Sequence, residues 1–131
     1  MSENPGRLSR VFKSAWFSRA ARKSGIGDDE LCAGIRQVML GQAADLGGGV
    51  FKKRLDRNRS RSIILAKGRR YWVYVYLFAK KDKANISRSE LAEFRALADL
   101  YARKTDSDIE KELELGEISE ICNENKTQIQ E

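Results

Sequence analysis

Two cationic side chains, Lys52 and Arg54, stand two positions apart in a segment that follows three consecutive glycines. Glycine has no Cβ, so the backbone before this segment can take left-handed conformations and close approaches that other residues cannot. Because the side chains of a strand alternate between its faces, Lys52 and Arg54 would project together while Phe51 and Leu55 turn toward the core. Neighbouring cations repel each other unless an anion binds them, and phosphate is the anion that we expect.

Basic residues dominate the stretch around this segment, where the only acids between residues 46 and 89 are Asp56 and Asp82. The clustered cations are Lys52, Lys53, Arg54, Arg57, Arg59, Arg61, Lys67, Arg69, Arg70, Lys80, Lys81 and Lys83. Residues 1–104 carry 23 Lys and Arg against 10 Asp and Glu, whereas residues 105–131 carry 2 against 9. A basic body with an acidic end suggests a polyanion partner, and a C-terminal segment that folds back or mimics it; a solvated basic surface is the plainer alternative.

The chemistry open to these residues is limited by what the chain lacks. It has no histidine, which excludes histidine bases, histidine triads and nearly every zinc arrangement. No paired carboxylates lie in the basic stretch to hold magnesium, so we expect neither a metal nor a cofactor.

Cleavage of RNA is still possible without these groups, because the RNA's own 2′-OH can attack the adjacent phosphate. Clustered lysines lower one another's pKa, so that one can act as a base, and arginines can clamp the phosphate through two hydrogen bonds. Basic residues alone fit plain binding equally well.

Hydrophobic periodicity predicts one α+β domain with an antiparallel sheet of about four strands. The expected strands cover residues 10–13, 50–55, 61–66 and 70–79, with a further short strand at 118–121. A helix hairpin is expected over residues 14–24 and from 28 to Gly41, and later helices from the capping box at 87–90 and from Thr105 to Leu115. The aromatics of the last long strand, Trp72, Tyr74, Tyr76 and Phe78, should share one face, as core packing more often than as a base-stacking stripe.

The remaining features concern the ends of the chain and its compartment. Residues 1–9 and 123–131 are polar, and we expect them to be flexible. Cys32 and Cys122 lack a CxxC spacing and are most simply reduced thiols. No apolar run approaches the length of a membrane span, and the N-terminus does not resemble a signal peptide, so the cytoplasm is the expected location.

The order of elements and several motifs resemble the RelE/ParE superfamily of bacterial toxins, in particular HigB-like RelE-family toxins of type II toxin–antitoxin modules. The resemblance covers about residues 10–122 and is carried by Phe12-Lys13, Trp16-Phe17, Ala21-Arg22-Lys23-Ser24-Gly25, Leu31-Cys32, the run from Asp45 to Arg54, the run from Tyr76 to Ser87, and Gly116 to Ile121. It implies a RelE-like toxin domain over residues 10–122, in which residues 105–122 form an acidic extension.

The resemblance implies a metal-independent endoribonuclease that cleaves messenger RNA, usually in the ribosomal A site, and a cognate antitoxin, usually of helix-turn-helix type. Carried over to this chain, Lys52 would be the base, Arg54 and Arg61 would clamp the phosphate, and Lys81 would protonate or stabilise the leaving oxygen. The further nucleic-acid contacts would be Lys53, Arg57, Arg59, Lys80 and Lys83.

Two departures from the family pattern concern loops and base stacking. Relatives have a longer loop of the form GxGKSGGxR where this chain has Asn58-Arg59-Ser60-Arg61, and a well-studied branch has a tyrosine near the position of Ser87. A ParE-like inhibitor of DNA gyrase and a degenerate, non-catalytic nucleic-acid-binding module are the alternatives. Convergent cations on the sheet face favour the nuclease, since a gyrase inhibitor does not need them.

Overall fold

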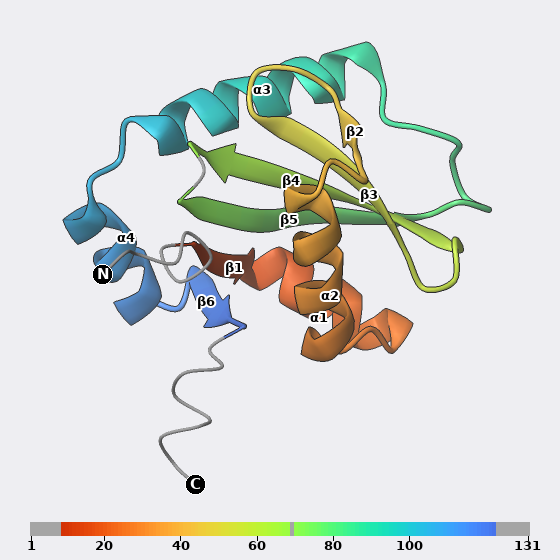
Figure 1. The fold of residues 1–131 in the computed structure, drawn as a ribbon, viewed down its shortest axis with the longest axis horizontal. Coiled ribbons are helices and arrows are strands. Elements are labelled where there is room, and N and C mark those ends of the chain that lie inside the picture. The colour runs from red at the N-terminus through yellow and green to blue at the C-terminus, as the bar shows by residue number, and fades with distance from the viewer. Residues whose placement is uncertain (1–8, 69, 123–131) are drawn as a thin grey trace, which may run out of the picture.

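The computed structural model describes residues 9–68 and 70–122, and these residues form an α+β fold with four helices and one six-stranded sheet (Figure 1). In chain order the elements are β1 (Arg10–Ser14), α1 (Ala15–Ser24), α2 (Asp28–Met39), β2 (Ala44–Asp45), β3 (Val50–Leu55), β4 (Ser60–Lys67), β5 (Tyr71–Ala79), α3 (Arg88–Ala102), α4 (Asp106–Glu114) and β6 (Ile118–Ile121). The strand order across the sheet is β2-β3-β4-β5-β1-β6. The ends that we predicted to be flexible lie outside the described residues, except Ser9.

The prediction of about four antiparallel strands was wrong in number and partly in direction. The short turns do make β3, β4 and β5 antiparallel neighbours, as predicted. However, β1 pairs with β5 in parallel, with Arg10 opposite Tyr71, and β6 and the two-residue β2 extend the sheet at its two edges. No turn length could show this, because β1 and β5 are far apart in the sequence.

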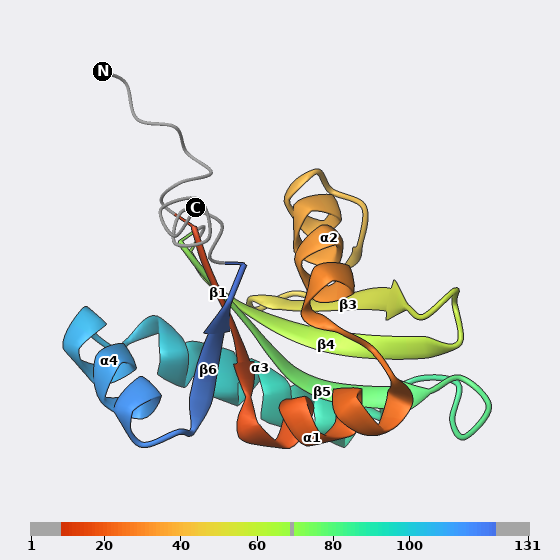
Figure 2. The same ribbon diagram turned by 90° about the horizontal axis from the view of Figure 1, so that it is seen from below.

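The sheet is covered on both faces, and each face has its own core. The α1–α2 hairpin packs on one face, where Phe17, Leu31 and Ile35 meet Tyr74 of β5. On the other face α3 and α4 cover Phe12, Val50, Ile63 and Val73 (Figure 2). Strand β5 lies between β4 and β1 with residues in both cores, which confirms its predicted place as an interior strand.

A β-bulge overturns the prediction that four aromatics of β5 share a face. Ile63 pairs with Tyr76 whereas its neighbour Ile64 pairs with Tyr74, so β5 contains one extra residue at this point. An extra residue reverses the faces of all positions beyond it. Trp72 and Tyr74 therefore belong to the α1–α2 core, while Tyr76 packs beneath α3 with its ring centroid 5.5 Å from that of Phe94.

The helix boundaries follow the predicted capping residues. Ser14 accepts a hydrogen bond from the N–H of Phe17 at 3.0 Å, and Gly25 ends α1 in a left-handed conformation. Ser87 and Glu90 form the predicted capping box of α3, and Thr105 begins α4 in the same way. These signals are local, so the sequence is sufficient to read them.

The two cysteines form a disulfide, contrary to the prediction of free thiols. Cys32 of α2 is bonded to Cys122, which directly follows β6, and their Cα atoms are 5.5 Å apart. The bond joins the helix hairpin to the last strand across 90 residues of sequence. A pair so far apart leaves no local spacing pattern.

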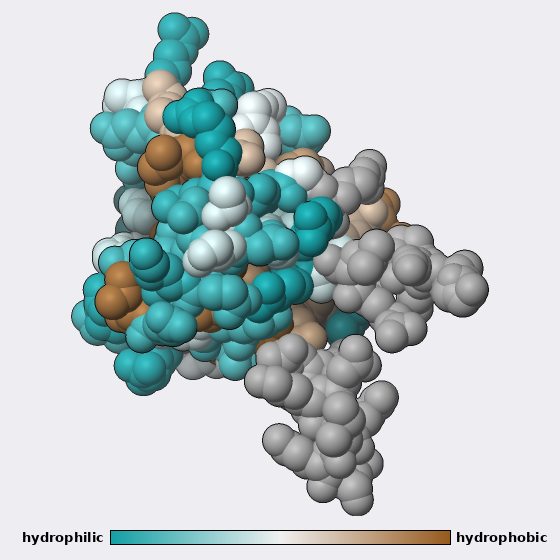
Figure 3. Space-filling view, turned by 90° about the vertical axis from the view of Figure 1, so that its left-hand side faces the viewer, coloured by the Kyte–Doolittle hydropathy of each residue, from teal (hydrophilic) through white to brown (hydrophobic). Residues whose placement is uncertain are grey.

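The acidic C-terminal segment folds back on the protein, but not on its basic surface. Arg10 of β1 pairs with Glu120 at 2.7 Å and with Glu110 at 3.1 Å, and Lys104 pairs with Glu112 at 2.6 Å. We use the name acidic end for α4, β6, the starts of β1 and β5, and the residues that close α3, including Arg103 and Lys104. It lies across the molecule from the β3–β4 turn (Figure 1). Its surface is mainly hydrophilic (Figure 3).

Candidate functional site

Three of the predicted site residues share one face of the sheet. Within β3, Lys52 and Arg54 alternate with the α2-facing positions, and across the ladder Arg54 lies opposite Arg61 of β4. Lys52 lies opposite Ile63, which belongs to the core beneath α3. Lys52, Arg54 and Arg61, the sheet-face group, therefore project on the α3 side, as the period-two pattern predicted for Lys52 and Arg54.

The sheet-face group has no carboxylate partner among the residues that the structure describes. The side chain of Lys52 donates to Asn85 Oδ1 at 3.2 Å, and Arg54 is exposed. Arg61 is only 8% exposed, yet its guanidinium donates only to the backbone oxygens of Asn58 at 3.0 Å and Ser60 at 3.3 Å. A buried cation without an acidic partner is unfavourable, so this face is suited to receive an anion.

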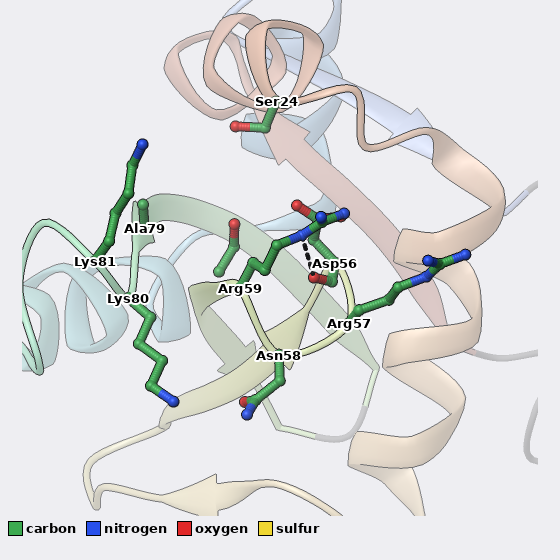
Figure 4. A pocket seen from close by; sticks show the side chains of 9 residues that line it. Ser24, Asp56, Arg57, Asn58, Arg59, Ala79, Lys80 and Lys81 are labelled. Carbon is green, nitrogen blue, oxygen red and sulfur yellow. Dashed lines mark hydrogen bonds and ion pairs between the residues drawn. The ribbon is translucent and has the colours of Figure 1, made fainter.

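A hollow of about 770 Å³ lies at the same end of the sheet, and the sheet-face group does not line it. It brings together the end of α1, the β3–β4 turn and the chain after β5 (Figure 4). We call it the end hollow, and its lining residues are Ser24, Asp56, Arg57, Asn58, Arg59, Ser60, Ala79, Lys80 and Lys81. The predicted proton donor Lys81 thus lies with Lys80, Arg57 and Arg59.

The β3–β4 turn, which separates the sheet-face group from the end hollow, has an unusual backbone. Asp56, Arg57 and Asn58 are all left-handed, with φ of 57°, 54° and 71°. Aspartate and asparagine adopt this conformation more readily than most residues, but for Arg57 it is unfavourable and persists only where surrounding contacts impose it. Here the backbone N–H of Asp56 donates to the carboxylate of Glu30 in α2 at 2.5 Å. The backbone N–H of Arg59 donates to the backbone oxygen of Asp56 at 2.9 Å. Such strain is typical of functional sites.

Lys53 and Lys83, which were also predicted to contact nucleic acid, lie outside both the sheet-face group and the end hollow. Lys53 lies on the α2 side of β3, where its ammonium donates to the Gln42 carbonyl at 3.2 Å. Burial, and next the charge of Arg54, lower the pKa of Lys53. Lys83 is paired with Glu90 at 2.8 Å, and this hydrogen bond raises the pKa of Lys83. Neither side chain joins the sheet-face group or the end hollow.

The glycine run before β3 has a structural role that can be read from its contacts. Gly47, Gly48 and Gly49 all have positive φ, and the side chain of Arg95 from α3 lies across the first two. A Cβ on Gly48 would approach Arg95 to 3.0 Å, and one on Gly49 would approach the Ala66 oxygen to 3.1 Å. The predicted close approach to this backbone is confirmed: α3 approaches Gly47 and Gly48, and β4 approaches Gly49.

Sequence reasoning missed the uncharged members of the site. Ser24 and Ser60 line the end hollow, and Asn85 holds Lys52. Ser24 could have been proposed from the sequence, because it belongs to the run from Ala21 to Gly25 that resembles the family. Ser87, where a related branch has a tyrosine, caps α3 and accepts from the N–H of Glu90 at 3.1 Å.

Two further features bear on the class of protein. Within the part of the chain that the structure describes, no three His, Cys, Asp or Glu side chains are grouped so that they could hold a metal ion. No helix in the described ranges is long and apolar enough to cross a membrane.

A comparison with protein families supplies the identity that the geometry suggests. A family model described as the RelE toxin of the RelE / RelB toxin–antitoxin system matches residues 9–121. A search of curated proteins gives no match. The family match confirms the resemblance to RelE-type toxins, while the narrower HigB-like assignment stays a prediction. Membership implies a cognate antitoxin. The chain belongs to the RelE family of toxins of toxin–antitoxin systems.

Proposed function

We propose that this RelE-family toxin is an endoribonuclease that cleaves messenger RNA on the ribosome. The observation that carries the proposal is the sheet-face group: Lys52, Arg54 and the buried Arg61 without a carboxylate partner among the described residues. An RNA phosphate would supply the missing negative charge, and two arginines suit its oxygens because each can donate two parallel hydrogen bonds. RelE toxins are generally ribonucleases, which supports the same activity here.

The proposed reaction uses the RNA's own hydroxyl as nucleophile. Lys52 acts as the general base and accepts the proton of the 2′-OH, and the 2′-oxygen forms a bond to the adjacent phosphorus. Arg54 and Arg61 stabilise the extra negative charge that develops on the phosphate oxygens. The bond from phosphorus to the 5′-oxygen then breaks, and Lys81 donates a proton to that oxygen. The products are a 2′,3′-cyclic phosphate and a 5′-hydroxyl.

The finer family assignment belongs to the same proposal. We place the chain in the HigB-like branch, with an antitoxin of helix-turn-helix type as its partner and the cytoplasm, where messages are translated, as its location. The motifs that carry this assignment are the run from Asp45 to Arg54 and the run from Tyr76 to Ser87.

The test is induced expression in a bacterium, with growth and the 5′-ends of messages followed together. The protein should arrest growth and create new in-frame message ends, and the triple variant Lys52→Ala/Arg54→Ala/Arg61→Ala should do neither. A matched control, Arg103→Ala, removes an exposed cation at the acidic end that is already paired with Asp99, and should behave like the unchanged protein.

The other outcomes separate the alternatives. Growth arrest with intact messages would contradict the proposal and favour inhibition of gyrase. Absence of arrest would contradict it in favour of a binding module without activity.

A further inference from the structure

We propose that the end hollow and the exposed side of α1 form a second RNA surface, which holds the single-stranded RNA that continues from the cleaved bond. This inference rests on the proposed function and extends it, because it places part of the substrate beyond the sheet-face group.

The two surfaces are joined through Arg61. Its guanidinium belongs to the sheet-face group, yet it donates to the backbone oxygens of Asn58 and Ser60, which both line the end hollow. Only the β3–β4 turn therefore separates a phosphate held by Arg61 from the hollow. An RNA strand that leaves the sheet face across this turn enters the hollow directly.

The charges of the end hollow suit a chain of phosphates. Its single acid, Asp56, is paired with Arg59 at 2.9 Å, whereas Arg57, Lys80 and Lys81 have no acidic partner among the described residues. Figure 4 shows that the side chains of Lys80 and Lys81 extend in opposite directions and that Arg57 extends away from both. One small anion could not contact all three cations, but a strand could place its cleaved bond at Lys81 and later phosphates at Lys80 and Arg57.

Helix α1 continues this surface, because it ends at the hollow with Ser24. It contains no acidic residue, and its cations Arg19, Arg22 and Lys23 are exposed without an acidic partner in the described chain. Trp16 is 45% exposed and stacks on Tyr76 with 5.2 Å between ring centroids. Trp16, Arg19 and Lys23 share a helix face by their spacing.

An exposed indole beside unpaired cations is the combination that binds single-stranded RNA, because bases stack on the ring while cations contact phosphates. The volume of the hollow, about 770 Å³, lies within the range of sites that enclose small organic ligands. The hollow can thus take nucleotide-sized groups, and α1 can hold the strand beyond it.

The experiment measures binding of RNA oligonucleotides that carry a 2′-O-methyl group at every position and cannot be cleaved. Short and long oligonucleotides are compared by fluorescence anisotropy over a series of salt concentrations. The test variant is Arg57→Gln/Lys80→Gln, and the control Arg103→Ala/Lys111→Ala removes the same charge at the acidic end. Thermal unfolding establishes that each variant is folded.

We expect the test variant to bind the long oligonucleotide about tenfold more weakly, with a salt slope smaller by about two, and to bind the short one as the unchanged protein does. The control should leave both affinities unchanged. A further variant, Trp16→Leu, should weaken only the long oligonucleotide, by about fivefold or more.

The failure of this inference differs from a failure of the proposed function. If the sheet-face triple variant loses binding while the test variant and Trp16→Leu bind every length as the unchanged protein does, the second surface is refuted and the nuclease proposal stands. If the unchanged protein binds no oligonucleotide at any salt concentration, the second surface is refuted, and the expression test decides the nuclease proposal separately.

Discussion

The two ends of the sheet treat positive charge in different ways. At the acidic end, three described cations have carboxylate partners in the same fold: Arg10 with Glu110 and Glu120, Lys104 with Glu112, and Arg70 with Asp106. At the end with the β3–β4 turn, the described cations without a carboxylate partner include Lys52, Lys53, Arg54, Arg57, Arg61, Lys80 and Lys81. Cations that the fold neutralises hold its own elements together, whereas those left without partners are available to an external anion.

The contacts of Arg10 illustrate how the fold neutralises a cation with its own carboxylates. Its guanidinium donates to both carboxylate oxygens of Glu120, at 2.7 and 2.9 Å, and these bonds raise the pKa of Arg10. It also lies over the rings of Phe12 and Tyr71, 5.2 and 5.8 Å from their centroids. Such a paired, two-bond contact has the geometry of a stabilising interaction between β1 and β6.

The largest expected effect concerns Arg61, a cation without a carboxylate partner among the described residues. The substitution Arg61→Met keeps a long apolar side chain but removes a buried charge that has no acidic partner among the described residues. We expect cleavage of RNA to fall by about 10²–10³-fold, because one donor to the transition state is lost. The melting temperature should not fall. Cleavage at the unchanged rate would contradict the role of unpaired cations at this end.

The disulfide gives the next effect and concerns stability alone. Reduction of the bond between Cys32 and Cys122, or Cys32→Ser, should lower the free energy of unfolding by about 2–4 kcal/mol, since the bond closes a long loop. Urea denaturation with and without reductant measures this, and Cys32→Ser should show no further change on reduction. Equal midpoints with and without reductant would contradict a structural role for the bond.

The left-handed turn allows a smaller and more selective test. Glycine takes positive φ without strain, so Arg57→Gly should raise the free energy of unfolding by about 0.5–1 kcal/mol. Asn58→Gly should change it by less, because asparagine already tolerates this conformation. Only Arg57→Gly removes a cation, and only it should weaken RNA binding. A gain in stability together with weaker RNA binding for Arg57→Gly would separate backbone strain from charge. A loss of stability with Arg57→Gly would refute the strain.

The smallest expected effect is the response of the helix caps to acid. A hydrogen bond from Tyr71 lowers the pKa of Asp106, and hydrogen bonds from Thr105 lower that of Asp108. Groups whose pKa is lower in the folded state stabilise it above their unfolded pKa, and this stability is lost as the pH falls through the folded value. The melting temperature should therefore decrease below about pH 4. Asp108→Asn should reduce this decrease, and an identical pH profile would contradict the contribution of the cap.

The sequence was informative where the relevant signal is local. Ser14, Ser87 and Thr105 were read correctly as caps because a cap depends on residues three positions away. The shared face of Lys52 and Arg54 followed from strand alternation, which needs no knowledge of the rest of the fold.

Long-range features were not predictable in the same way. The parallel pairing of β1 with β5 and the bond between Cys32 and Cys122 join distant parts of the chain. The bulge that separates Tyr74 from Tyr76 arises from pairing with β4, which no pattern within β5 reveals. The end hollow needs three segments at once, so its cations could be proposed individually but Ser60 could not.

The most direct test compares one cation from each end, Arg54→Ala and Arg10→Ala, by thermal unfolding and by cleavage of a ribosome-bound message with purified protein. We predict that Arg54→Ala keeps its melting temperature and loses about 100-fold in cleavage. Arg10→Ala should melt at a lower temperature, while its folded fraction cleaves at the unchanged rate. Unchanged cleavage by Arg54→Ala, or an equal loss of cleavage in the folded fraction of Arg10→Ala, would contradict the division between the two ends.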